Sequence, residues 1–109
     1  MKIRFLEPGN RPYKPTPLNY FVYDRYIRTP SVGLNTLATI VKELVDDTYM
    51  YSESISRIDM ADVEDADIVF IGIFTFAAVR GYELADHLRA HGRGLVGLGG
   101  LHASMNCAE

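Results

Sequence analysis

Ile68-Val69-Phe70-Ile71-Gly72-Ile73-Phe74 is a continuous apolar run of β-branched and aromatic residues, bounded by Asp67 and Thr75. Runs of this kind are typical of strands that are buried on both faces, as in parallel sheets between two layers of helices. The run therefore predicts an α/β fold built around one central strand.

The segments on either side of this run extend the same pattern. Short β-favouring segments predict further strands at 2–6, 48–51 and 95–98, with 48–51 at an edge of the sheet. Apolar residues at helical spacing predict helices over about 31–46 and 77–91, and a helical turn over 59–66. The alternation of strands and helices predicts a doubly wound, Rossmann-like parallel sheet.

Two residues are expected to cap the long helices. Thr29 can accept hydrogen bonds from free backbone N–H groups, and Pro30 suits a first helical position. Thr75 ends the central run, which places its hydroxyl at the ligand edge of the sheet. The same hydroxyl can cap the 77–91 helix, and the two roles are compatible.

Composition excludes several classes of protein. The chain has 109 residues, 48% of them hydrophobic, which is enough for one domain with a core. Eleven Lys and Arg against 14 Asp and Glu give a net charge of −3, so no nucleic-acid partner is expected. No apolar run reaches the roughly 18 residues of a membrane span. A single cysteine, Cys107, excludes an internal disulfide and predicts a reducing, cytoplasmic location.

Residues 7–30 form a long connection that holds all five prolines and the aromatic stretch Tyr20-Phe21-Val22-Tyr23. Connections of this length inside a domain are usually functional or disordered. The rings of this stretch are expected either to fix the connection onto the domain or to line a flat ligand or a partner domain.

Ligands of parallel sheets bind beyond the carboxyl ends of the strands, which makes 7–17, 75–81 and 99–106 the candidate segments. The last of them begins with Gly99-Gly100-Leu101-His102. Paired glycines allow close approach of the backbone to a ligand, or form a tight turn. Gly97-x-Gly99-x-x-His102 is only a near miss to the dinucleotide fingerprint, since His102 replaces the third glycine. His87 and His91 share a helix face, where a solvated surface with a weak Glu83–His87 pair is favoured over a metal site.

Four stretches in order along the chain resemble one family. They are Met1-Lys2-Ile3 with its Pro-bearing loop, 30–38 (Pro-Ser-Val-Gly-Leu-Asn-Thr-Leu-Ala), 65–73 (Asp-Ala-Asp-Ile-Val-Phe-Ile-Gly-Ile) and 98–104 (Leu-Gly-Gly-Leu-His-Ala-Ser). Together they resemble the N-terminal cobalamin-binding domain of cobalamin-dependent radical S-adenosylmethionine (radical SAM) enzymes, of which the anaerobic magnesium-protoporphyrin IX monomethyl ester cyclase is a member.

The resemblance implies a flavodoxin-like sheet with strand order 2-1-3-4-5. It also implies a corrin ring across the carboxyl ends of the strands, with the nucleotide tail of cobalamin threaded between strands and loops. Thr75, Gly99 and Gly100 match the family positions that approach this tail. The further cofactor-binding candidates are Pro8, Asn10 and Phe76 beside the corrin, together with Leu101 and His102.

The first loop departs from better-known cobalamin proteins, which carry Asp-x-His-x-x-Gly there. Here the loop is Glu7-Pro8-Gly9-Asn10-Arg11-Pro12, and no histidine precedes His87. The resemblance thus implies cobalamin without a histidine ligand from this loop, and neither a catalytic nor a metal-ligating residue is assigned.

The iron–sulfur chemistry of the family needs a Cys-x-x-x-Cys-x-x-Cys motif, which the single Cys107 cannot supply. The [4Fe–4S] cluster and S-adenosylmethionine are therefore expected in a C-terminal radical SAM domain, with residues 1–109 as the N-terminal fragment of a longer protein. The sheet would then have order 2-1-3-4 with a fifth strand missing. Its open fourth strand predicts pairing with another copy or marginal stability.

Three other functions remain open on the residues alone. A phosphoreceiver domain would need an Asp at the end of the third strand, where the chain has Phe74-Thr75. A flavodoxin-like flavin binder would need a Ser/Thr-rich loop after the first strand, where only Thr16 is near. An interaction module would use the aromatic stretch to dock a partner.

Overall fold

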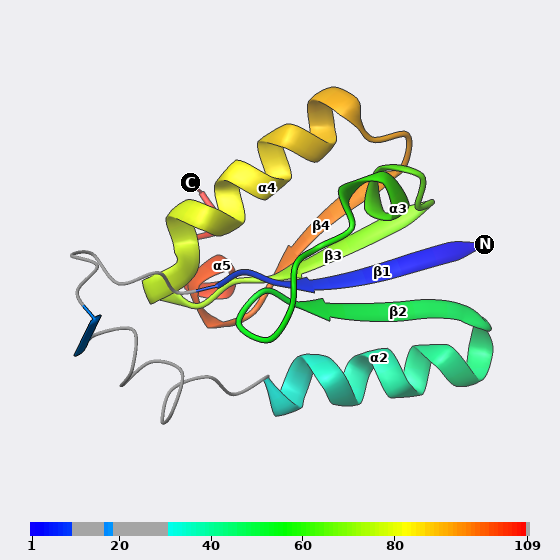
Figure 1. Cartoon of the computed structure of the whole chain (residues 1–109), viewed down its shortest axis with the longest axis horizontal. Coiled ribbons are helices and arrows are strands. Elements are labelled where there is room, and N and C mark those ends of the chain that lie inside the picture. The colour runs from blue at the N-terminus through cyan, green and yellow to red at the C-terminus, as the bar shows by residue number, and fades with distance from the viewer. Residues whose placement is uncertain (10–16, 19–30, 109) are drawn as a thin grey trace.

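Four parallel strands form the centre of the computed structural model, in the order β2-β1-β3-β4 (Figure 1). The structure describes residues 1–9, 17–18 and 31–108. The strands are β1 (Lys2–Glu7), β2 (Asp47–Ser52), β3 (Ile68–Gly72) and β4 (Leu95–Gly99). This order and the parallel pairing confirm the predicted flavodoxin-like arrangement, with β2 at one edge.

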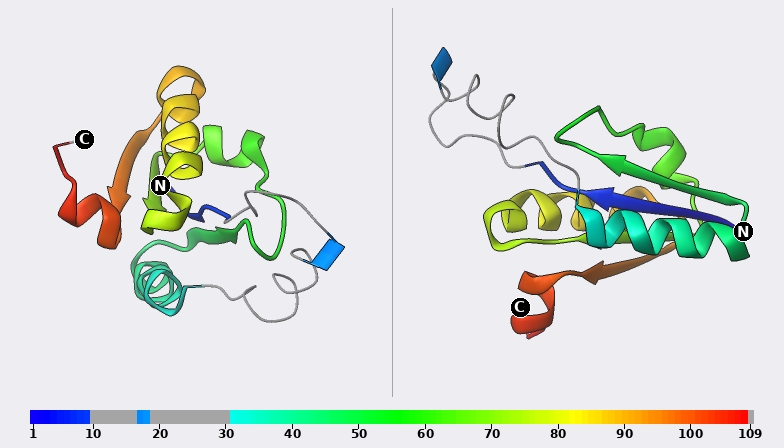
Figure 2. Two further views of the ribbon diagram at one scale, coloured as in Figure 1. Left: turned by 90° about the vertical axis from the view of Figure 1, so that its left-hand side faces the viewer. Right: turned by 90° about the horizontal axis from the view of Figure 1, so that it is seen from below.

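Helices cover the two faces of the sheet unequally. One face carries α3 (Met60–Glu64) and α4 (Ala78–His91), whereas the other carries α2 (Val32–Leu44). A short helix, α5 (Leu101–Met105), follows β4, and a 3₁₀ turn, η2 (Thr75–Ala77), precedes α4. In the view from the α2 side, α2 does not overlie β4 (Figure 2, right).

The hydrophobic core is divided in the same unequal way. Ten buried residues, among them Leu6, Ile71 and Leu84, form the cluster on the α4 face. Among the described residues, the cluster on the α2 face has only Ile3, Phe5 and Ala38 as buried members. Within that part of the chain, the α4 face of the sheet is therefore better filled than the α2 face.

The expectation that the central run is buried on both faces is wrong. β3 ends at Gly72, and Phe70 remains 39% exposed on the α2 side. Phe70 is in register with Gly97 of β4, which offers it no side chain. The apolar character of residues 68–74 predicted the strand correctly. It could not show that Phe70 remains partly exposed on the α2 side of the sheet.

The expectation that Thr29 caps the first long helix is also wrong. The N-cap of α2 is Ser31, whose Oγ accepts a hydrogen bond from the backbone N–H of Leu34 at 3.4 Å. Thr29 and Pro30 lie outside the described residues. Residues 101–105 form α5, a helix that the sequence patterns did not predict.

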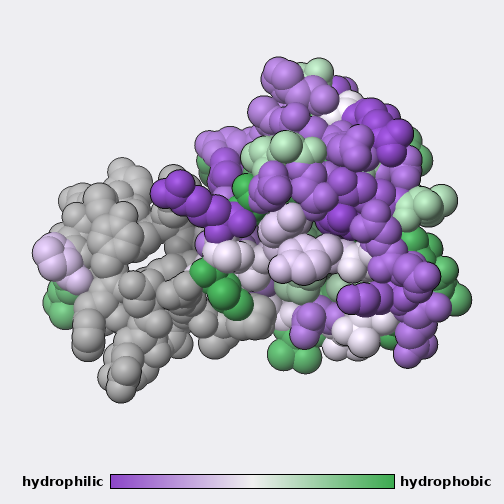
Figure 3. Space-filling model, turned by 45° about the vertical axis from the view of Figure 1, so that its right-hand side comes forward, coloured by the Kyte–Doolittle hydropathy of each residue, from purple (hydrophilic) through white to green (hydrophobic). Residues whose placement is uncertain are grey.

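A charged network holds the amino-terminal half of the sheet, on the α3 face. Arg4 is 6% exposed, and its guanidinium donates to both oxygens of Asp62, with the shorter contact 2.6 Å from Nε to Oδ2. Asp62 also accepts from Lys2 Nζ at 2.7 Å and from the Tyr51 hydroxyl at 2.9 Å. Asp47 completes the pairing of Arg4 at 2.9 Å. The side of the molecule that Figure 3 brings forward is mostly hydrophilic.

This network makes the stability of the fold depend on pH. The hydrogen bond from Arg4 is the main reason that the pKa of Asp62 lies far below its usual range, with Lys2 and Tyr51 adding to the effect. A carboxyl with a depressed pKa in the folded state stabilises the fold above its unfolded pKa, and the contribution is lost as the pH falls through the folded value. Urea unfolding should therefore give a lower free energy at about pH 3 than at about pH 6.

The variant Asp62→Asn tests the origin of this acid sensitivity. Without the Asp62 carboxyl, the stability difference between the two pH values should shrink. An equal difference in both proteins would show that other carboxyl groups cause it.

Candidate functional site

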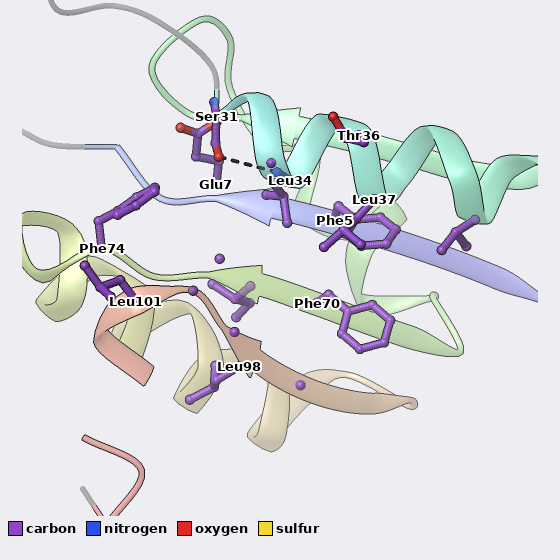
Figure 4. Close-up of a pocket in the computed structure, with 17 residues that line it drawn as sticks. Phe5, Glu7, Ser31, Leu34, Thr36, Leu37, Phe70, Phe74, Leu98 and Leu101 are labelled. Atoms are coloured by element: carbon purple, nitrogen blue, oxygen red, sulfur yellow. Dashed lines mark hydrogen bonds between the residues drawn. The ribbon is translucent and has the colours of Figure 1, made fainter. Parts of the chain in front are cut away.

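An apolar groove of about 890 Å³ lies between α2 and the carboxyl-terminal half of the sheet (Figure 4). Its lining comes from α2 (Gly33, Leu34, Thr36, Leu37, Val41), from the strands (Phe5, Phe70, Ile71, Gly72, Gly97, Leu98, Gly99) and from the carboxyl edge (Glu7, Ser31, Phe74, Gly100, Leu101). A volume of this size is typical of a site for a small molecule or cofactor.

Glycines make the floor of the groove flat next to two stacked rings. Phe5 and Phe70 stack with centroids 5.3 Å apart and an interplanar angle of 27°. A Cβ at Gly97 would lie 2.9 Å from the Phe70 ring, so only glycine leaves room for this ring. A Cβ at Gly99 would meet no heavy atom within 4 Å, because this residue borders open space. A planar, apolar group could thus lie against the backbone here.

Gly100 makes the turn that ends the groove. Its φ of 93° and ψ of 178° fall in a region that essentially only glycine adopts. The adjoining backbone ties β4 to β3, since Ile73 N–H donates to Gly99 O at 2.8 Å and His102 N–H donates to Ile73 O at 3.2 Å. The ends of the two strands are therefore held side by side.

Gly100→Ala should lower the free energy of unfolding by about 2 kcal/mol, because a Cβ would enforce a strained backbone and lie 2.7 Å from Ile73 O. Gly99→Ala is the matched control, since it adds the same methyl group to open space and should change stability by less than about 0.5 kcal/mol. Urea unfolding of both variants checks this, and equal effects would contradict the assignment of strain to Gly100.

A polar contact lies at the carboxyl edge of β3 and β4, outside the groove lining. His102 Nδ1 is 3.3 Å from Thr75 Oγ1, and His102 Nε2 is 3.1 Å from the Tyr82 hydroxyl of α4. Thr75 does not cap α4, whose N-cap is Ala77 without a side-chain hydrogen bond. The capping expectation for Thr75 is therefore wrong, and its hydroxyl instead lies beside an imidazole.

The sequence-predicted site residues are divided between several places. Gly99, Gly100 and Leu101 line the groove, whereas Thr75 and His102 meet at the edge. Pro8 is buried next to α4, where its Cγ would lie 3.5 Å from a Cβ at Gly81. Asn10 lies outside the described residues, and of Phe76 only the backbone, in η2, is described.

Sequence reasoning included Glu7 in the candidate segment 7–17 but gave it no role, although it is the only ionisable residue among those described that line the groove. Its Oε2 accepts from the backbone N–H of Ser31 at 2.9 Å and from the Ser52 hydroxyl at 3.2 Å. The position of Glu7 at the end of the first strand was a usable signal, because ligands bind beyond such ends. The apolar walls from α2 could not be recognised, since helix periodicity does not show which side remains uncovered.

The histidines of α4 do not form the pair predicted for them. His87 Nε2 lies 2.6 Å from Glu64 Oε1 of α3, and Glu83 instead contacts Arg80 at 3.4 Å. The ring of His91 stacks on His87 at 4.5 Å. Within the described part of the chain, no three His, Cys, Asp or Glu residues are placed to hold a metal ion.

No helix in the described ranges is long and apolar enough to cross a membrane. No protein-family model, curated protein or solved structure matches the chain. The groove and the carboxyl edge of the sheet are thus the features from which a function can be argued.

Proposed function

We propose that this chain is a cobalamin-binding module that serves a radical SAM enzyme of the methyltransferase or oxidative cyclase class, similar to the anaerobic magnesium-protoporphyrin IX monomethyl ester cyclase. The groove between α2 and the sheet would hold the nucleotide tail of cobalamin. The observation that carries the proposal is the position of this groove, which opens at the carboxyl ends of β3 and β4 and is floored by Gly97 and Gly99.

The lining fits a benzimidazole nucleotide in size and in polarity. The Phe5 and Phe70 rings and the Leu34 side chain give an apolar enclosure for a planar base, because removal of such a base from water is favourable. The glycine floor allows the base to approach the backbone closely. At the edge, the Thr75 hydroxyl and the His102 imidazole can exchange hydrogen bonds with amide groups of a corrin.

The chain itself would bind and orient the cofactor. Cobalamin supplies organometallic chemistry at its cobalt centre. No histidine precedes His87, so the first loop offers no imidazole to the metal. The role of the groove would be to fix one side of the cofactor and exclude water from the base.

Equilibrium dialysis against hydroxocobalamin tests the proposal, with cobinamide, which lacks the nucleotide tail, as the matched control. We expect the chain to retain cobalamin during gel filtration and to bind cobinamide at least about tenfold more weakly, since the tail occupies the groove. No retention of cobalamin would refute the proposal.

A second planar nucleotide also fits the shape of the groove. Flavin mononucleotide has a flat ring system that could lie over Gly97 and Gly99. Its phosphate, like the phosphate of the cobalamin tail, would have to lie away from Glu7, because like charges repel. Parallel dialysis with this flavin distinguishes the two, and preferential retention of the flavin would favour a flavodoxin-like function.

A further inference from the structure

Glu7 lies where its carboxylate can contact the polar part of a ligand whose apolar part occupies the groove. Its side chain lines the groove at the end of β1, beside Ser31 at the start of α2 (Figure 4). The carboxylate is fixed by Ser31 N–H and the Ser52 hydroxyl, which both donate to Oε2. These contacts come from the start of α2 and the end of β2, so the acceptor is held by two separate elements.

The second carboxylate oxygen, Oε1, has no hydrogen-bond donor among the described residues. Both donors to Oε2 are neutral, and no described cation pairs with Glu7. A carboxylate oxygen beside apolar walls forms a stronger hydrogen bond than one in water. A ligand that offers a donor at this point would therefore gain affinity and be selected over one that does not.

A hydroxyl group suits this position better than a cation. The walls next to Glu7 are apolar, and burial of an ammonium group there would cost more free energy than burial of a neutral hydroxyl. A flat base on the glycine floor followed by a hydroxyl-bearing sugar at Glu7 is the chemical order of a nucleoside.

We propose that Glu7 is a specificity-determining residue that accepts a hydrogen bond from the 2′ or 3′ sugar hydroxyl of a nucleoside bound in the groove. This inference rests on the proposed cobalamin function for the identity of the nucleoside. The groove would then distinguish a ribonucleoside from its free base through one carboxylate.

The test measures binding of the ribonucleoside of 5,6-dimethylbenzimidazole, its 2′,3′-dideoxy analogue and the free base to the whole chain. Glu7→Gln keeps a carbonyl oxygen for Ser31 and Ser52 but removes the charge. Its affinity for the ribonucleoside should fall at least about tenfold, because charge-assisted hydrogen bonds are the stronger class. Its affinity for the dideoxy analogue and the free base should stay within about twofold.

Glu43→Gln is the matched control, since Glu43 is exposed on α2 and does not line the groove. Equal losses for all three probes, or no loss for the ribonucleoside, would overturn the role of Glu7 even where cobalamin binds. Glu7-dependent ribonucleoside binding without cobalamin binding would leave this inference standing and refute the proposed function. Binding of none of the probes by the wild-type chain would refute this inference, and the proposed function would be refuted as well only if cobalamin were also not retained.

If the Glu7→Gln variant does not fold, binding of the three probes to the wild-type chain still tests the inference. The wild-type chain should bind the dideoxy analogue about as weakly as the free base. A dideoxy analogue that binds as tightly as the ribonucleoside would overturn the inference without any variant.

Discussion

Gly99→Phe should lower the affinity for cobalamin by about 100-fold or more, which corresponds to about 2.8 kcal/mol at 1.4 kcal/mol per tenfold change. A Cβ at this position meets no heavy atom within 4 Å, and the residue lines the groove, so the ring would take the space of the nucleotide base. The fold should survive, because the ring enters open space and aromatic residues are favoured in strands. Dialysis measures the loss, and circular dichroism verifies the fold.

Leu95→Phe is the control for this substitution. Leu95 lies on the same strand as Gly99 and, four residues earlier, on the same face, but it does not line the groove and is 74% exposed. Its replacement should leave cobalamin affinity within about twofold. Full binding by Gly99→Phe would place the tail elsewhere and refute the groove as its site.

Asp62→Ala is expected to have the largest effect on stability, a decrease of about 3 kcal/mol in the free energy of unfolding. The substitution would leave Arg4 buried without its main partner, and loss of one member of a buried ion pair is costly. It would also remove the acceptor of the Tyr51 hydroxyl, whose pKa burial and this contact raise to about 12. Urea unfolding near neutral pH measures the change.

Asp65→Ala provides the comparison, because Asp65 also pairs with Lys2 but its side chain is 67% exposed. Exposed ion pairs contribute about 0 to 1 kcal/mol, so this variant should unfold almost as the wild type does. Similar losses for the two variants would mean that the burial of Arg4 does not determine the strength of the network.

The elements of this fold follow from local patterns, and the sequence predicts them well. The alternation of apolar strands with amphipathic helices was sufficient for the parallel sheet and for α2 and α4 within a few residues, whereas the strand order was predicted only from the family resemblance. Turn residues were less informative. Thr75 has the chemistry of a cap, yet in three dimensions its hydroxyl meets His102.

The groove could be predicted only in part. Gly99 and Gly100 were recognisable, because paired glycines at a strand end indicate close approach of the backbone. Leu34 and Phe5 were not, since each becomes a groove residue only through neighbours distant in sequence. Arg4 was also missed, because a charged residue within a strand usually faces water, and its partner Asp62 lies 58 residues away.

The three-residue core on the α2 face has a consequence for the lifetime of the protein. A molecule that fills the neighbouring groove adds apolar contacts which this face otherwise lacks, so ligand and chain together behave as one folding unit. By mass action, a ligand at 100 times its dissociation constant adds about 2.7 kcal/mol to stability. Resistance to proteases should then rise with ligand concentration, which would couple the abundance of the protein to the supply of that ligand.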